Sequence, residues 1–452
     1  MLKLVASLAL LLIAVASARG QCPGCPSVAK CPSVQVEEEH CHWLEVTGLV
    51  PGGVAEKAGV KPGDVLYSYG GRTVGCMADL GRAKEAATAE SVDVVFRRAG
   101  GGVRLRLARA QQLGVYLNEW QKDVVPDKDA RIIRGVAELS WATGKENSFM
   151  AALEAVLRQQ GVDVSYAMLC GASGAAFRLH FFDTWCPSSA DPSCGFDATR
   201  PALAACGYSA DALRIATDGK NRGQMLARVR KSIDAGVPVL AFGLNENPEW
   251  GVITGYQKQG EEMFVRTYFD TRKNYDLAQG LPRLVVIPRR TGRAPATVAS
   301  MRRSFAIAAE NLATEKYGEY YSGLAAFDRW QTRLLGDDFT GLDSAGFSNV
   351  VQANYWMFSR LVSDRRTGLE YLVRVKQQLP KHAGLIDQLV ELYTAELELL
   401  APFEDKLPRP GSATKPEDWS QAMRAEQAAI LAQAQELELK VLPLWQELAA
   451  AK

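Results

Sequence analysis

The sequence lacks a net charge that would select a class of partner. Its 452 residues carry 52 Lys and Arg against 51 Asp and Glu. Domains that bind nucleic acid or an anionic surface show a basic excess, so we predict no nucleic acid partner. The hydrophobic fraction of 47% and the charged fraction of 23% are those of ordinary globular domains. At about 150 residues per domain, the chain is long enough for roughly three domains.

Long apolar runs are also missing, except at the N-terminus. There, Lys3 is followed by LVASLALLLIAVA and by the A-x-A sequence Ala16-Ser17-Ala18, the order typical of a secretory signal peptide. A membrane-spanning helix needs about 20 apolar residues, so this run is too short for a comfortable span. We predict a signal peptide over residues 1–18, a secreted or periplasmic protein, and no membrane span after its removal. Anchoring through Cys22 is the less favoured alternative, because Gln21 stands where a lipoprotein needs a small residue.

Cysteine occurs at nine positions, an odd number. In an exported protein disulfides are permitted, and an odd count leaves at least one thiol free or bonded to another chain. Cys186 and Cys194 flank a short loop that a disulfide could close. Residues 19–42 are rich in Cys and Pro, but their spacing matches no zinc module, so we predict a linker there. No metal and no cofactor is predicted.

Residues 43–118 show a regular series of turns and strands. The stretch GLVPGGVAEKAGVKPGDVLYSYGGRTV holds a turn at Pro51-Gly52-Gly53, a short helix and a hairpin turn at Gly70-Gly71. VDVVFRR and VRLRLAR alternate apolar and polar residues on either side of a glycine turn. This region resembles the PDZ domains of bacterial secreted proteases. The resemblance implies a β-barrel-like domain that binds the C-terminus of a peptide or protein.

The resemblance implies a strand order that is circularly permuted relative to animal PDZ domains. It places the carboxylate-binding loop at the end of the domain, at Gln112, Leu113, Gly114 and Val115. Such loops present successive backbone N–H groups to a peptide carboxylate, while the adjoining strand pairs with the peptide. Gly114 would let the backbone approach closely. The alternative is a PDZ fold that serves as a spacer or docking surface without binding a free C-terminus. A polar linker, 119–138, follows.

Residues 139–290 contain a helix and a buried strand that carry a second resemblance. In NSFMAALEAVLRQQG the apolar residues fall at helical spacing, and EWGVITGY reads as a strand. Both resemble the N-terminal domain of the butirosin biosynthesis protein H family and, more distantly, C39-type and papain-like cysteine peptidases. The resemblance implies an α+β fold with its nucleophile at a helix N-terminus, where free N–H groups favour an anion.

The positions of that family's reactive residues hold different residues here. Ser148 stands in place of the nucleophilic cysteine, Glu249 in place of the histidine, and Asp270 near the third position. A serine hydroxyl needs a base to become a nucleophile, and a carboxylate is a weak base unless burial raises its pKa. We therefore predict a non-catalytic copy. The alternative is an acyltransferase or amide hydrolase that uses Ser148, with Glu249 and Asp270 assisting. Trp250 would lie beside the cleft, to stack a ligand or to cover the sheet.

Two other residues in this region, Cys170 and His180, are of types that serve as a nucleophile or a base in enzymes. Cys170 precedes Gly171-Ala172-Ser173-Gly174, which the family uses as a packing turn, and Ala175 replaces the last glycine of a G-x-S-x-G elbow. His180 is the single histidine between 139 and 290. It lies in the aromatic stretch FRLHFFDTW, whose alternating pattern is typical of a strand. We predict structural roles for both side chains.

From 297 to 452 the apolar spacing is helical throughout, and the helix with YYSGLAAFDRW resembles the part that follows the cysteine domain in butirosin-H-like proteins. The predicted fold class is therefore α+β and multidomain: a PDZ domain, a papain-like domain and a C-terminal helical bundle. The predicted function is an exported protein that binds a peptide or protein C-terminus, with a papain-like module that binds a ligand or partner. A third hypothesis gives the helical bundle a purely structural role in assembling oligomers.

Overall fold

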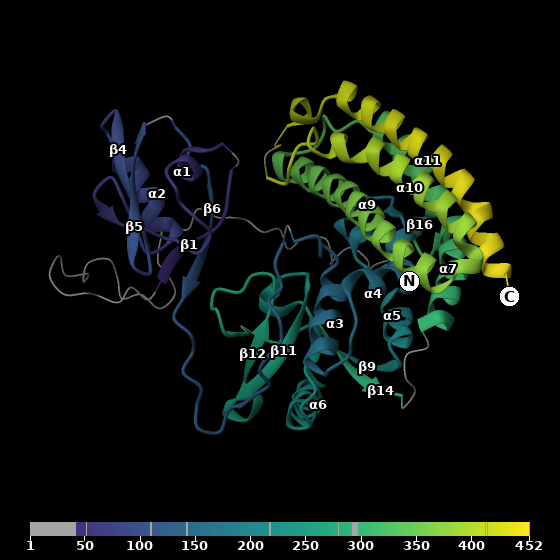
Figure 1. Ribbon diagram of the computed structural model, residues 1–452, viewed down its shortest axis with the longest axis horizontal. Coiled ribbons are helices and arrows are strands. Elements are labelled where there is room, and N and C mark those ends of the chain that lie inside the picture. Colours follow the sequence, from purple (N-terminus) through teal and green to yellow (C-terminus); the bar gives the residue numbers. More distant parts are fainter. Residues whose placement is uncertain are drawn as a thin grey trace. The chain divides into compact units, whose positions relative to one another are not determined.

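The computed structural model describes residues 42–451 except 51, 109–110, 142, 217, 279, 292–296, 412 and 414. The predicted signal peptide and residues 19–41 lie outside the described residues. The chain is of mixed α+β class, as predicted, and divides into two compact units (Figure 1). The first comprises Met1–Asp123 with Thr271–Asn274, and the second Val124–Asp270 with Tyr275–Lys452. Among the described helices, none combines the length and the apolar character that crossing a membrane requires.

The first unit is built on one antiparallel sheet with the strand order β5-β4-β2-β1-β6, and β3 pairs with β2. The first and last strands of this order do not pair, so the sheet of this barrel-like domain is open. The elements are β1 (His42–Leu49), α1 (Val54–Lys57), β2 (Val65–Tyr69), β3 (Arg72–Thr73), α2 (Met77–Ala86), β4 (Ser91–Arg98), β5 (Gly101–Ala108) and β6 (Val115–Gln121).

Alternation of side chains explains the core of this unit. In β4 the side chains of Val92, Val94 and Phe96 are buried, while Asp93 and Arg97 are not. Successive side chains of a strand point to opposite faces, so one face of this open sheet can pack on a core while the other meets water. The VDVVFRR pattern therefore forms a strand, as the sequence predicts.

The second unit contains a larger antiparallel sheet, in the order β13-β12-β11-β10-β14-β9, with β7 beside β11. Its strands are β7 (Arg131–Ile132), β9 (Tyr208–Arg214), β10 (Val239–Phe242), β11 (Trp250–Gln257), β12 (Glu262–Arg266), β13 (Asp276–Leu277) and β14 (Leu284–Arg290). The predicted linker, 119–138, thus contains the end of β6 and the whole of β7.

Helices cover both faces of this sheet. On one face α3 (Ser148–Gln159) packs with Leu240 and Val252. On the other, α6 (Arg222–Asp234) packs with Val239 and Ile253. A strand that is buried on both faces needs apolar residues at consecutive positions, which is why β10 and β11 read as continuous apolar runs.

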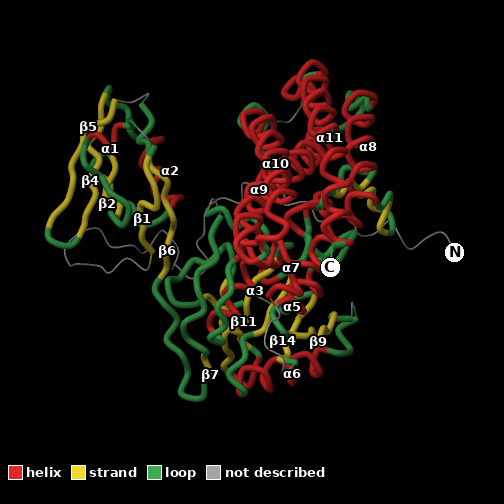
Figure 2. The backbone as a smooth tube through the Cα atoms, turned by 45° about the vertical axis from the view of Figure 1, so that its right-hand side comes forward, coloured by secondary structure: helices red, strands yellow, loops and turns green. Residues whose placement is uncertain are grey.

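The helices α4 to α11 complete the second unit, and Figure 2 shows α8, α9, α10 and α11 gathered side by side. Phe177 packs against Tyr371 and Trp445, so the predicted papain-like and helical regions share one hydrophobic core. The remaining elements are α4 (Tyr166–Ala172), β8 (His180–Phe182), α5 (Thr199–Ala205), α7 (Thr297–Ala313), β15 (Lys316–Tyr317), β16 (Tyr320–Ser322), α8 (Gly323–Gly336), α9 (Ser344–Gln378), α10 (Ala383–Glu404) and α11 (Gln421–Ala450).

A buried ionic cluster joins three of these helices. Arg365 on α9 is fully buried and donates to Glu396 on α10 and to Glu438 on α11. Burial raises the pKa of Glu396 to about 8, although Arg365 opposes the shift, and burial also raises the pKa of Glu438. One guanidinium faces two carboxyl groups, so the native cluster favours a bound proton on the carboxyl pair.

We expect this proton to make the stability of the protein pH-dependent. The native pKa of Glu396, about 8, lies above the value of 4.5 for an ordinary glutamate. Between pH 4.5 and 8 the native state therefore binds more protons than the unfolded state. The free energy of unfolding falls as the pH rises through this range, by up to about 1.4 kcal/mol per pH unit. Denaturant unfolding of Glu396→Gln from pH 5 to 8 should show a smaller fall than the wild type.

The matched control is Glu398→Gln, on an exposed side chain of the same helix. This control should follow the wild-type curve. If the free energy of unfolding fell equally with pH in Glu396→Gln and in the wild type, the proton on the carboxyl pair would be contradicted.

Candidate functional site

The outer edge of β6 is the first candidate site. β6 is the last strand of its sheet, and its inner edge pairs with β1 from His42 opposite Gln121 to Leu49 opposite Val115. Within the described chain, no strand pairs with its outer edge between Val115 and Glu119. An unpaired strand edge presents N–H and C=O groups to which an extended peptide can add. We refer to this stretch, Val115–Glu119, as the β6 edge.

The predicted carboxylate-binding loop leads directly into this edge. Gly114 has φ +72°, a left-handed conformation that glycine adopts at little cost. The carbonyl groups of Leu113 and Gly114 accept hydrogen bonds from Ala55 N at 3.3 Å and Val50 N at 3.0 Å. These bonds hold the loop against the start of α1. In the described part of the chain, the N–H groups of Leu113 and Gly114 donate to no backbone carbonyl, so they remain available to an anion.

Helix α2 is tied to the far end of the β6 edge. The backbone N–H of Met77 donates to Glu119 Oε2 at 2.8 Å, and Glu119 Oε1 lies 3.0 Å from His42 Nδ1. Helical periodicity places Gly81, four residues on from Met77, on the same side of α2. A Cβ atom added at Gly81 would meet no atom within 4 Å apart from its own stretch of helix. This side of α2 therefore has open space.

A family comparison agrees with this geometry. Residues 45–98 match the family model described as PDZ domain. The first unit contains a PDZ domain. PDZ domains are protein-binding and peptide-binding modules. The match begins within β1 and ends at the last residue of β4, and the structure adds β5 and β6 to the same sheet. No curated protein matches the chain at a significant level.

The second candidate site joins Ser148 to Glu249. Ser148 is the first residue of α3, and Glu249 directly precedes β11. Ser148 Oγ accepts a hydrogen bond from Trp250 N at 3.3 Å, and the Ser148 side chain lies close enough to the Glu249 carboxyl group to influence its pKa. Burial raises the pKa of Glu249, and the nearby Ser148 side chain opposes that rise. The structure thus brings two of the three predicted positions together.

Asp270 does not complete this pair. Its carboxylate accepts hydrogen bonds from Thr267 N at 2.7 Å and Thr267 Oγ1 at 2.9 Å, and it pairs with Arg266 at 3.0 Å. In the described structure it makes no hydrogen bond to Glu249 or Ser148. Burial raises the pKa of Asp270 to about 6, against the effect of Arg266. Asp270 closes the turn after β12, so a third group that orients Glu249 is missing from the predicted position.

Trp250 belongs to the core and does not line a cleft. Its side chain is 2% exposed, and its ring packs edge-on against Phe149 and tilted against Phe242. Of the two roles predicted for it, covering the sheet agrees with this placement and stacking a ligand does not. Ser148 is also only 2% exposed, so its hydroxyl group lies beneath the protein surface.

Sequence reasoning missed Arg360 and Tyr268, which lie around the same helix start. Arg360, on α9, donates to the carbonyl oxygen of Glu146, and its charge lowers the pKa of Glu249. The hydroxyl of Tyr268 donates to the carbonyl oxygen of Lys145 at 2.7 Å. An arginine within a long amphipathic helix carries no local signal that it contacts a site encoded more than 200 residues earlier.

Cys170 and His180 have the structural roles that we predict. Cys170 is fully buried in α4, and burial raises the pKa of its thiol well above the ordinary value, so the thiol stays protonated. His180 is 2% exposed and accepts a hydrogen bond from Phe196 N at 3.4 Å. Burial lowers the pKa of His180 well below the ordinary value, which keeps the ring neutral.

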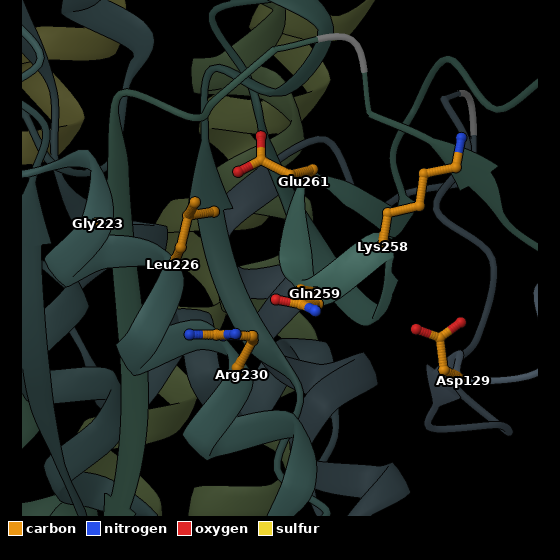
Figure 3. Close-up of a pocket in the computed structure, with 7 residues that line it drawn as sticks. All are labelled: Asp129, Gly223, Leu226, Arg230, Lys258, Gln259 and Glu261. Atoms are coloured by element: carbon orange, nitrogen blue, oxygen red, sulfur yellow. The ribbon is translucent and has the colours of Figure 1, made fainter.

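Other features of the described chain add no second reactive centre. Cys186 and Cys194 are both free thiols, so the disulfide that could close their loop is not formed. Among the described residues no cluster of three metal-ligating side chains occurs. A shallow surface pocket lies between α6 and the turn before β12 (Figure 3), and Ser148 is not among the residues that line it. Its volume is about 490 Å³, and it is lined by Asp129, Gly223, Leu226, Arg230, Lys258, Gln259 and Glu261.

We expect Ser148 to act as a structural link between α3 and β11. Ser148→Ala removes the acceptor of the buried backbone N–H of Trp250, and should lower the free energy of unfolding by about 1–2 kcal/mol. Denaturant titration measures this loss. The control, Ser209→Ala, changes an exposed serine of the same unit and should leave stability unchanged. Wild-type stability for Ser148→Ala would contradict the structural role.

Proposed function

We propose that this protein binds the C-terminus of a peptide or protein partner along the β6 edge. The observation that carries this proposal is the unpaired β6 edge together with the loop that precedes it. In this loop the carbonyl groups of Leu113 and Gly114 are bonded within the domain, and the N–H groups of the same residues donate to no backbone carbonyl of the described chain. A terminal carboxylate placed at Leu113 and Gly114 would accept from these N–H groups. The last residues of the partner would then pair with the β6 edge as an added strand.

Side chains of the loop and strand indicate the chemistry of the last ligand residue. Leu113 is nearly buried in the core of the first unit, and Val115 and Leu117 pack partly exposed against that core. These three side chains alternate along the chain, so they share one face. An apolar C-terminal residue would cover them and gain the free energy of apolar burial, about 25 cal/mol per Å².

The second unit, in this proposal, is a non-catalytic module of papain-like descent that serves as a ligand- or partner-binding body. The proposal rests on the resemblance of residues 139–290, on the absence of a histidine base from the predicted position, and on the burial of Ser148. Export is a further part of the proposal, supported by Lys3 and the apolar run that follows it.

The carboxylate contact can be tested at Gly114. Gly114→Asp places a negative charge beside the proposed carboxylate and should weaken binding at least about tenfold, because like charges at close range repel. The control, Gly114→Asn, imposes the same backbone strain and nearly the same volume without the charge, so it should retain most of the affinity. The probe is a pool of ten-residue peptides with random sequence and free C-termini, measured against the same pool with amidated C-termini.

Equal binding of free and amidated peptides to the wild type would contradict the proposal. Equal losses in Gly114→Asp and Gly114→Asn would also contradict it, because backbone strain would then explain the loss.

A second candidate function is acyl transfer or amide hydrolysis by Ser148. The proximity of Ser148 to Glu249 favours it, together with the raised pKa of Glu249, because a carboxylate with a pKa nearer to neutral is a better base. As a test of this alternative, purified protein is incubated with a fluorophosphonate probe. The non-catalytic proposal predicts no labelling above the level of Ser148→Ala. Labelling that is lost in Ser148→Ala and in Glu249→Gln would establish the enzyme instead.

A further inference from the structure

The β6 edge does not stay unpaired to the end of the strand. The segment Thr271–Asn274, which belongs to the first unit, contacts β6 at Gln121. The N–H of Gln121 donates to the carbonyl oxygen of Thr271 at 2.6 Å, and Gln121 forms a parallel bridge with Arg272. A piece of this chain therefore already occupies the last position of the outer edge.

The alternation of a β-strand shows which backbone groups remain. Because the N–H of Gln121 points outward to Thr271, the N–H groups two, four and six residues earlier point outward as well. These belong to Glu119, Leu117 and Val115. On the outer side, opposite β1, no strand of the described chain pairs with these three residues. The edge thus offers three outward-facing residues and then stops.

We propose that the segment Thr271–Asn274 is a stop that limits the bound ligand to about its last five residues. This inference rests on the proposed function, since it concerns the same edge. A ligand whose carboxylate lies at Gly114 runs antiparallel to β6, so alternate residues pair with Val115, Leu117 and Glu119. The next pairing would need the N–H of Gln121, which Thr271 already uses. Beyond that point the ligand must leave the strand.

The stop also selects the kind of partner. A strand inside a folded sheet continues at both ends, and here the loop at Gln112–Val115 closes one end while Thr271 closes the other. Only a free chain terminus with a short extended tail fits between them. The partner we infer is therefore a protein with a flexible C-terminal tail.

Side-chain bonds hold the stop in place. Arg272 donates through Nη2 to Gln121 Oε1 at 2.7 Å and through Nε to the carbonyl oxygen of Lys122 at 3.0 Å. The backbone N–H of Asn274 donates to Asp123 Oδ1 at 3.0 Å, and its side-chain amide contacts the other oxygen of Asp123. None of these bonds involves the β6 edge itself, so loosening them leaves the ligand-binding residues unchanged.

The closing experiment selects ligands from a displayed library with ten random C-terminal positions and free C-termini, using the full chain. Wild-type selection should be confined to about the last five positions. The double variant Arg272→Ala/Asn274→Ala loses side-chain bonds that hold the stop, which frees the N–H of Gln121 for the ligand, and selection should reach further upstream. A ten-residue peptide from the selected pool should bind the double variant about five- to tenfold more tightly than its five-residue end does, the gain of roughly one added hydrogen bond. For the wild type the two lengths should bind within about twofold.

Arg104→Ala, an exposed arginine on β5, is the control and should behave as the wild type. Wild-type selection at the sixth or seventh position from the end would overturn the stop on its own. An unchanged length ratio in the double variant would overturn it as well. If either of these results is found while binding still requires a free C-terminal carboxylate, the stop is rejected and the proposed function stands. Equal binding of free and amidated peptides would reject the proposed function itself.

Discussion

Backbone polar groups need hydrogen-bond partners, and this requirement decides what the first unit can do. β1 satisfies one edge of β6, and nothing in the described chain satisfies the other edge until Gln121. The carbonyl groups of the loop before β6 are bonded inward to Val50 and Ala55, which leaves N–H groups for a ligand. A partner that brings a carboxylate and an extended tail supplies what the sheet lacks.

The second unit meets the same requirement internally. At the start of α3 the side chain of Asn147 accepts from Met150 N, Ser148 accepts from Trp250 N, and Arg360 donates to the carbonyl oxygen of Glu146. These three bonds pair backbone groups at this helix end with groups of the same unit. A reactive centre needs groups that are free to bind a substrate, and the close pairing here favours a structural link between α3 and the sheet.

Prediction from sequence succeeded where a local pattern is tied to a local structure. The alternation in VDVVFRR predicts β4, and the apolar spacing after Asn147 predicts α3. The proximity of Ser148 and Glu249 followed from a resemblance, because spacing alone cannot bring together residues about a hundred positions apart. Asp270 and Trp250 were harder to place, since a carboxylate or an indole after a strand can face either a cleft or the core.

The sequence by itself determined the secondary structure of the PDZ domain, the glycine that its loop requires at position 114, and the absence of a histidine from the site at α3. Each depends on residue identity or on periodicity along one short segment. Only the tertiary structure decided that the PDZ sheet is open, that Thr271 reaches Gln121, and that Arg365 holds two buried carboxyl groups. These depend on contacts between segments far apart in the chain, where the outcome is set by which surfaces pack together and leave the fewest polar groups without a partner.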